Sequence, residues 1–185
     1  MAVRVLLIGK RAAVLTRLQA ALRDIGIEAD LTRDVSGADR GELRRYAAVA
    51  FDRAVGEEDR SRMKEAFRAA NPNVVYVDGF APITPLLVAQ FEEALDRRPK
   101  TERKIAAVAR ANARIEIELR APVRVQVTVY RLTRLYRTRT ARLLDEQLQS
   151  GRRRVELPAR LAGAREAFAV VRAEADEVRV IPLGA

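Results

Sequence analysis

The stretch "VRVLLIGKRAAV", residues Val3 to Val14, decides the fold of the first half of the chain. Val3 to Ile8 is a continuous run of mostly β-favouring apolar residues, which is typical of a strand buried on both faces of a parallel sheet. From Ala12 to Ile25 apolar residues recur at spacings of three and four, and Gly26 follows where a helix end tolerates a positive φ. The stretch therefore predicts a strand, a turn that contains Lys10, and a helix.

The same alternation of strand and helix repeats before residue 98. The further strands are predicted at Ile27–Thr32, Ala47–Phe51 and Val74–Val77, and the further helices at Asp39–Tyr46, Glu57–Ala70 and Thr84–Leu95. Four such units require right-handed crossovers and a parallel sheet with helices on both faces. We predict a small doubly wound domain over residues 1–98, with the strand order 2-1-3-4.

The pattern changes in the second half of the chain. The charged segment "LDRRPKTERK", residues 95–104, lacks apolar periodicity, and we assign residues 99–104 as a linker. Beyond it hydrophobic residues alternate with charged ones, first over residues 115–119 and then over residues 123–129. Further short strands are predicted up to residue 183, so we expect an antiparallel β-sandwich over residues 105–185. The predicted fold class is α/β plus all-β.

Composition excludes several kinds of chemistry. The chain has 185 residues, of which 49% are hydrophobic, and it contains neither cysteine nor histidine. Disulfides, thiolate nucleophiles, zinc sites built on Cys or His and imidazole bases are thereby excluded. No apolar run is long enough for a membrane span or for the core of a secretory signal. We expect a cytoplasmic protein with no cofactor and no metal ion.

The net charge of +10 belongs mainly to the second half of the chain. Residues 1–98 hold 16 basic and 15 acidic side chains, whereas residues 99–185 hold 19 and 10. The densest basic feature consists of Arg131, Arg134, Arg137, Arg139, Arg142, Arg152, Arg153 and Arg154. Such a cluster contacts phosphates in nucleic-acid-binding proteins. The alternative is a face that is solvated or contacts another protein.

The stretch "VRVLLIGKRAAVLTRLQAALRDIGIEAD", together with Asp52 at the end of the third strand, resembles the receiver domain of bacterial response regulators over residues 1–95. In that family an acidic pair after the first strand binds magnesium, and an aspartate that ends the third strand accepts phosphate. A hydroxyl residue and a lysine end the fourth and fifth strands. The acceptor position is matched here by Asp52.

The other receiver positions differ in this chain. Gly9 and Lys10 replace the acidic pair, Asp78 stands at the hydroxyl position, and no clear fifth strand with its lysine is found. Because a hard-cation cage needs carboxylates, the resemblance implies a degenerate receiver pocket that is not phosphorylated. Lys10 then either takes the place of the cation and pairs with Asp52 or Asp78, or is a solvated lysine.

The predicted fourth strand, Val74, Val75, Tyr76 and Val77, is wholly apolar and lies at an edge of the sheet. Unprotected edges of this kind promote association, so we expect this one to be covered. A second copy, the segment Arg103–Ala111 and the second domain are the three candidate covers. A simple solvent-facing edge is the alternative.

The run "ARIEIELRAPVRVQVTVYRLTRLYRTRTARLLDEQLQSGRRRVELPARL" resembles bacterial immunoglobulin-like or fibronectin-type-III-like modules. The resemblance covers residues 105–185. Such modules bind proteins or carbohydrate or act as spacers, and the resemblance implies no catalytic residue.

Together these patterns predict a non-catalytic regulatory or scaffolding protein, not an enzyme, which acts through a protein partner or a homo-oligomer. The alternative is binding of nucleic acid or another polyanion by the arginine-rich sandwich. A third hypothesis is an enzyme that uses Asp52, Lys10 and Asp78, although a lysine between two carboxylates is more often a structural ion pair.

Overall fold

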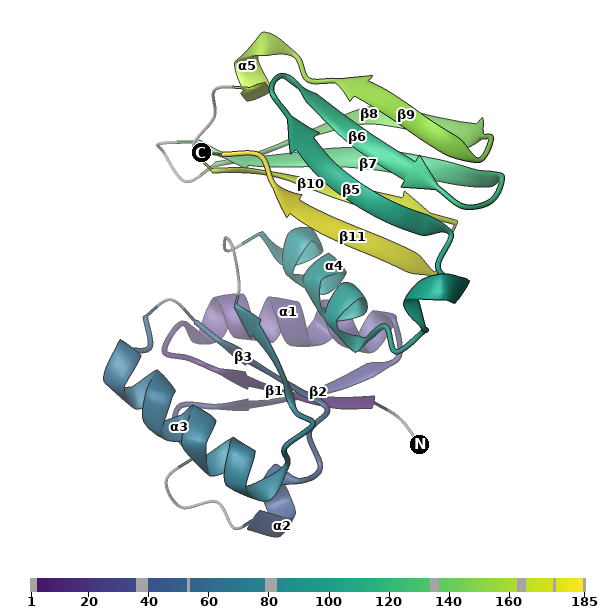
Figure 1. The fold of residues 1–185 in the computed structure, drawn as a ribbon. Helices are drawn as coiled ribbons and strands as arrows, with labels where there is room; N and C mark the ends of the chain where they lie inside the picture. The colour runs from purple at the N-terminus through teal and green to yellow at the C-terminus, as the bar shows by residue number, and fades with distance from the viewer. Residues whose placement is uncertain are drawn as a thin grey trace. The chain divides into compact units, whose positions relative to one another are not determined.

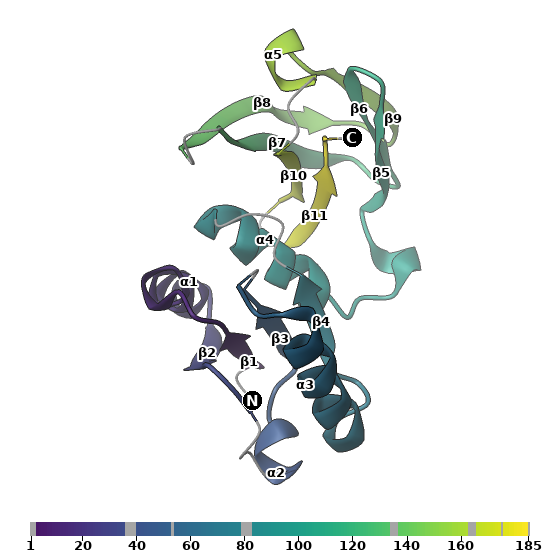
Figure 2. The ribbon, with the colours of Figure 1, turned by 90° about the vertical axis from the view of Figure 1, so that its left-hand side faces the viewer.

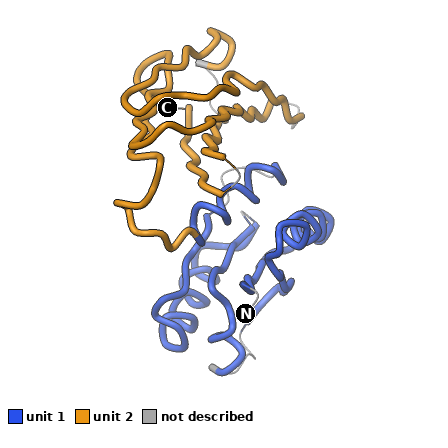
Figure 3. The backbone as a smooth tube through the Cα atoms, turned by 90° about the vertical axis from the view of Figure 1, so that its right-hand side faces the viewer, with its two compact units in different colours: residues 1–95 blue, residues 96–185 orange. Residues whose placement is uncertain are grey.

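The computed structural model describes residues 3–35, 40–52, 54–78, 83–133, 137–162, 166–174 and 176–184. The chain divides into two compact units, residues 1–95 and 96–185, which Figure 3 shows in different colours. Unit 1 contains a parallel sheet with helices, and unit 2 contains two antiparallel sheets. The predicted fold class is confirmed.

Unit 1 consists of alternating strands and helices. They are β1 (Val3–Ile8), α1 (Ala12–Asp24), β2 (Ile27–Thr32), α2 (Arg40–Leu43), β3 (Ala48–Phe51), α3 (Glu57–Ala70), β4 (Val75–Asp78) and α4 (Thr84–Leu95). The strands are parallel and lie in the order β2-β1-β3-β4, as predicted (Figure 1). The second helix is shorter in the described residues than the predicted Asp39–Tyr46.

The two faces of this sheet carry separate hydrophobic cores. Val5 and Leu7 of β1 pack with α1 and α4, whereas Leu6 and Ile8 pack with α2 and α3 (Figures 1 and 2). Successive residues of a strand point to opposite faces, so both sets become buried. This double burial is the physical reason for the unbroken apolar run in the sequence.

A close approach between the ends of β1 and β3 requires glycine at position 9. A Cβ atom added to Gly9 would lie 2.5 Å from the Cβ of Asp52, which is closer than real Cβ atoms come. The Asp52 backbone N–H donates to the Ile8 carbonyl at 2.8 Å, which holds the two strand ends together.

Unit 2 consists of seven strands among its described residues. They are β5 (Ile105–Ala111), β6 (Arg114–Leu119), β7 (Val123–Leu132), β8 (Thr138–Leu148), β9 (Gly151–Glu156), β10 (Ala167–Ala173) and β11 (Glu177–Pro182). The 3₁₀ turn η1 (Lys100–Glu102) precedes them, and the short helix α5 (Ala159–Ala162) joins β9 to β10. One sheet has the order β11-β10-β7-β8 and the other β5-β6-β9 (Figure 1).

The core of unit 2 lies between these two sheets. Every second residue of β7 from Val123 to Val129 is at most 1% exposed, and these valines pack with Ile115 and Ile117 of β6 and with inward residues of β10. The segment Arg103–Ala111 was one candidate cover for the edge of the first sheet. Its residues 105–111 instead form β5, which pairs with β6.

The described helices include none that is both long enough and apolar enough to cross a bilayer.

Gly9→Ala is expected to lower the free energy of unfolding by about 1–3 kcal/mol, because the new methyl group overpacks the contact with Asp52. The measurement is urea denaturation of the full chain. Gly56→Ala is the matched control, since a Cβ there meets nothing within 4 Å. Gly56 is the N-cap of α3, so this variant loses only the modest N-cap advantage of glycine over alanine. Equal losses in the two variants would contradict the steric explanation.

Candidate functional site

The predicted receiver-like pocket lies at the carboxyl ends of the strands in unit 1, where Gly9, Asp52 and Asp78 come from β1, β3 and β4. Ligands of open α/β sheets bind at such ends. Asp52, however, forms hydrogen bonds within the turn that follows β3. Its Oδ1 accepts the Ala54 backbone N–H at 3.3 Å, and its carbonyl accepts the Val55 backbone N–H at 2.9 Å. Its Oδ2 is buried and has no hydrogen-bond partner in the part of the chain that the structure describes.

Lys10 is exposed, and within the described part of the chain it forms no ion pair with Asp52 or Asp78. Asp78 pairs with Arg60 of α3 at 3.5 Å, and its carbonyl accepts a hydrogen bond from Gln90 Nε2 at 3.1 Å. Of the two alternatives for Lys10, the structure therefore shows the solvated lysine. No group of three potential metal-ligating side chains occurs among the described residues.

The predicted interaction edge corresponds to β4 and the residue before it. Val74 and Val77 are buried, and the half-buried Tyr76 stacks on the Phe51 ring with 6.3 Å between the ring centroids. The Tyr76 hydroxyl donates to the Lys64 carbonyl at 3.0 Å. These side chains are thus packed within unit 1, and the role of the edge as an interface stays a prediction.

The structure divides the predicted arginine cluster into two groups; Arg134 lies outside the described residues. The first group has carboxylate partners: Arg142 pairs with Asp145 at 3.2 Å, Arg153 with Glu146 at 3.7 Å, and Arg154 with Glu116 at 3.3 Å. The second group has no carboxylate partner among the described residues. It consists of Arg131, Arg137, Arg139 and Arg152.

Two arginines of the second group line a pocket at one end of unit 2. The pocket has a volume of about 320 Å³ and lies between β7, β8 and α5. It is lined by Arg131, Arg139, Thr140, Ala141, Arg160 and Leu161. The described residues of this lining bring three guanidinium groups and no carboxylate, so their charge is strongly positive.

Strand geometry brings these arginines together. Arg131 is two residues beyond the buried Val129, so the alternation of β7 places both on the face that forms the core. Arg139 is the direct partner of Arg131 across the β7–β8 ladder. The third cation comes from α5, and Arg131 Nη1 donates to the Arg160 carbonyl at 2.9 Å. Arg131 is thereby held toward the helix.

The electrostatics of this pocket favour an anion. Side chains directly opposite each other across a strand pair have Cβ atoms about 5 Å apart, and like charges in such a pair are destabilising. Leu161 is buried and Ala141 is half-buried, so part of the wall is apolar and screens the charges less than water does. An oxyanion bound between the guanidinium groups would remove the repulsion.

Arg160 was not among the residues predicted from the sequence. It lies outside the dense arginine runs, on a short helix that the residue pattern did not predict. Its position in the pocket depends on tertiary packing, because Leu161 of the same helix packs against the core.

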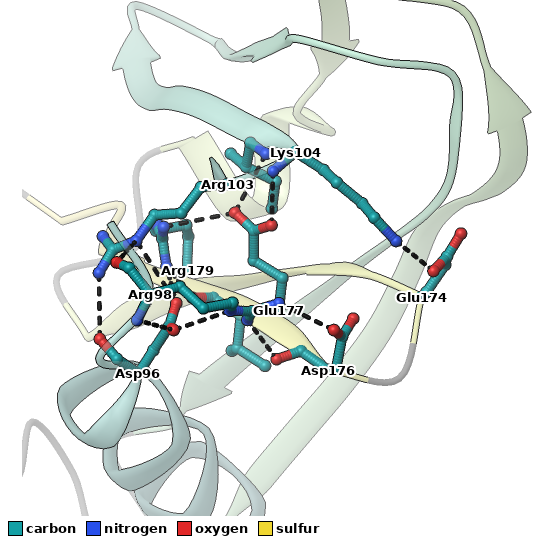
Figure 4. A network of polar contacts seen from close by, with 10 residues as sticks. Asp96, Arg98, Arg103, Lys104, Glu174, Asp176, Glu177 and Arg179 are labelled. Carbon is teal, nitrogen blue, oxygen red and sulfur yellow. Dashed lines mark hydrogen bonds and ion pairs between the residues drawn. The ribbon is translucent and has the colours of Figure 1, made fainter. Parts of the chain in front are cut away.

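A second charged cluster in unit 2 pairs its carboxylates with basic side chains and backbone N–H groups (Figure 4). The side chain of Glu177, at the start of β11, is 0% exposed. Its carboxylate accepts the backbone N–H groups of Lys104 at 2.7 Å and Ile105 at 3.0 Å, and Arg179 Nη2 at 3.3 Å. The buried charge is thus compensated by three donors.

Asp96 completes this cluster. Its Oδ1 accepts the Arg98 backbone N–H at 3.1 Å and Arg98 Nε at 2.9 Å, while Oδ2 is 3.5 Å from Arg103 Nε and 3.7 Å from Arg179 Nη1. Burial by itself would raise the pKa of Asp96, but the hydrogen bonds from Arg98 and the charges of Arg98 and Arg103 outweigh it and lower the pKa. Residues 99–104, assigned as a linker from the sequence, are held in unit 2 by these contacts.

Comparison with known proteins gives a likeness to solved structures only. No protein-family model and no curated protein matches the sequence. Among solved structures, the chain is similar to an NAD kinase from Archaeoglobus fulgidus in complex with ATP, with 14% identity and a TM-score of 0.37. The match covers 98% of this chain and 84% of that one. At this identity the likeness concerns the fold alone.

This finding corrects the resemblances drawn from the sequence. The interpretation as a pseudo-receiver domain followed by an immunoglobulin-like or fibronectin-like module is wrong, since the match runs through both units of a different kind of protein. The physical reason is that an apolar strand before a helix, an aspartate at a strand end and alternating valines are packing patterns. Many unrelated proteins with these layers share them.

The functional interpretation is corrected by the same finding. The non-catalytic regulatory scaffold rested on the missing metal cage of the receiver resemblance and on the apolar strand edge, and the alternative of polyanion binding rested on the arginine cluster. The enzyme was excluded on the missing cage and the lack of a catalytic grouping. The matched protein is by its description a kinase, and thus an enzyme. The absence of cysteine and histidine excludes particular catalytic groups and does not exclude catalysis.

Glu177→Gln is expected to lower the free energy of unfolding by about 3–5 kcal/mol, because it removes the charge of a buried pair and turns one acceptor of the Lys104, Ile105 and Arg179 donors into a donor. Urea denaturation of the full chain measures this loss. Glu174→Gln is the control: Glu174 pairs with Lys104, but half of its side chain is exposed, so we expect a loss of about 1 kcal/mol or less. Similar losses of unfolding free energy in both variants would contradict a larger stabilising role for the buried Glu177 carboxylate.

The lowered pKa of Asp96 makes part of the stability depend on pH. A carboxyl whose pKa is lower in the folded state stabilises the fold above its unfolded pKa of about 3.9, and this contribution is lost as the pH falls through the folded value. Asp96→Asn is therefore expected to show a smaller decline in the free energy of unfolding than the wild type below about pH 4. Identical slopes in a series of denaturation curves would contradict this.

Proposed function

We propose that unit 2 binds a small anionic molecule, through a phosphate or carboxylate group, in the pocket between β7, β8 and α5. The observation that carries the proposal is the convergence of Arg131, Arg139 and Arg160 on one cavity with no carboxylate among its described lining residues. The apolar wall formed by Ala141 and Leu161 adds surface for the rest of the molecule.

The chemistry of arginine supports this proposal. A guanidinium group presents a planar fork of donors that matches the oxygens of phosphate and carboxylate. Each charged hydrogen bond of this kind contributes about 1.5–3 kcal/mol. The volume of about 320 Å³ lies at the lower end of the range of small-molecule sites.

The distribution of paired and unpaired charge favours a small ligand over an extended one. Arg142 of β8 and Arg153 and Arg154 of β9 form ion pairs with Asp145, Glu146 and Glu116. Of the four cluster arginines without a carboxylate partner among the described residues, Arg131 and Arg139 line the pocket, so the unpaired charge does not follow the strands as a continuous stripe. The cytoplasmic location predicted from the sequence stays part of this proposal.

The test is calorimetric titration of the full chain with inorganic phosphate and with citrate at constant ionic strength. We expect saturable binding of at least one of them, weakened about tenfold or more by Arg139→Gln and by Arg160→Gln, since each removes a charged hydrogen bond worth at least 1.4 kcal/mol.

Arg142→Gln is the matched control, because it removes the same charge from the same strand while Arg142 is paired with Asp145 and lies outside the pocket lining. Its affinity is expected to stay within about twofold of the wild type, as for a rim charge. An equal weakening in Arg139→Gln and Arg142→Gln, or no binding of either anion, would refute the proposed site.

A further inference from the structure

On the basis of the proposed anion site, we infer that its ligand carries a diphosphate group. The inference concerns the class of the ligand and rests on the charge and the spacing of the three arginines. A diphosphate here means two linked phosphates, whether free as pyrophosphate or attached to an organic molecule.

The first argument is charge balance. The guanidinium groups of Arg131, Arg139 and Arg160 bring three positive charges, and no carboxylate of the lining offsets them. A single phosphate monoester carries about −1.5 to −2 at neutral pH, which leaves about one positive charge uncompensated in a partly apolar pocket. A terminal diphosphate carries about −3 and matches the pocket.

The second argument is spacing. Arg131 and Arg139 are a cross-strand pair, so their side chains start close together on the sheet. Arg160 comes from another element, α5. Its carbonyl accepts Arg131 Nη1, which holds the Arg131 guanidinium at the helix and leaves the other donors of that group for a ligand.

The guanidinium groups thus form two sets: that of Arg139 extends from the sheet, and those of Arg160 and Arg131 lie at the helix. One phosphate group can accept the forked donors of two arginines, while two linked phosphates offer oxygens to both sets at once. Binding through both phosphates would also connect β8 with α5.

The experiment titrates the full chain with phosphate, pyrophosphate and ADP by calorimetry, without divalent cations and at constant ionic strength. We expect pyrophosphate to bind at least 30-fold more tightly than phosphate. Arg139→Gln and Arg160→Gln are each expected to reduce this preference to less than fivefold, while Arg142→Gln keeps it. Thermal unfolding of each variant confirms that it is folded.

The outcomes separate the inference from the proposed function. Equal affinities for phosphate and pyrophosphate, both weakened by Arg139→Gln, would overturn the diphosphate inference and leave the anion site standing. Absence of binding by all three probes would overturn both. Tighter binding of ADP than of pyrophosphate supports the inference and assigns an organic diphosphate, and equal binding supports it and assigns pyrophosphate itself.

A single-stranded oligonucleotide is the remaining probe. Binding that exceeds that of pyrophosphate, and that Arg139→Gln and Arg142→Gln weaken equally, would overturn the inference in favour of a surface that responds to charge alone.

Discussion

The two-residue period of β7 is the constraint on which unit 2 depends. From Val123 to Val129 it places each second side chain between the two sheets, where these valines form the centre of the core. The same period continues to Arg131, whose side chain therefore starts on the core face at the point where α5 closes the sandwich. The last core valine and the pocket arginine are thus alternate residues on the same face of β7. A shift of register by one residue would turn both side chains to the other face.

Unit 2 uses arginine in two opposite ways, and the difference lies in the partners. Arg98 and Arg103 pair with the buried carboxylate of Asp96, and Arg179 pairs with that of Glu177. Glu177 also accepts backbone N–H groups of Lys104 and Ile105, so the network holds residues 96–105 to β11. At the pocket the arginines face each other without a carboxylate. In the first arrangement the chain itself supplies the negative charges. The second arrangement would be stabilised by an anion, because a bound oxyanion supplies the negative charge and the hydrogen-bond acceptors that the described lining does not.

In unit 1 the strand ends are occupied by contacts within the protein. Asp52 lies against Gly9 and accepts a backbone N–H of its own turn, and Asp78 pairs with Arg60. A resemblance based on one aspartate at a strand end does not detect these contacts. The chemistry of such an aspartate depends on neighbours that come from other strands and helices.

The sequence by itself determined the layers of both units, because burial on two faces gives continuous apolar runs and burial on one face gives alternation. It thereby predicted the order β2-β1-β3-β4 and an antiparallel sandwich, and it located the dense arginines. The tertiary structure decided which of these arginines are neutralised and that Arg160 joins Arg131 and Arg139. These facts depend on distances between segments far apart in the chain, and periodicity carries information about the face of a residue but not about its partner.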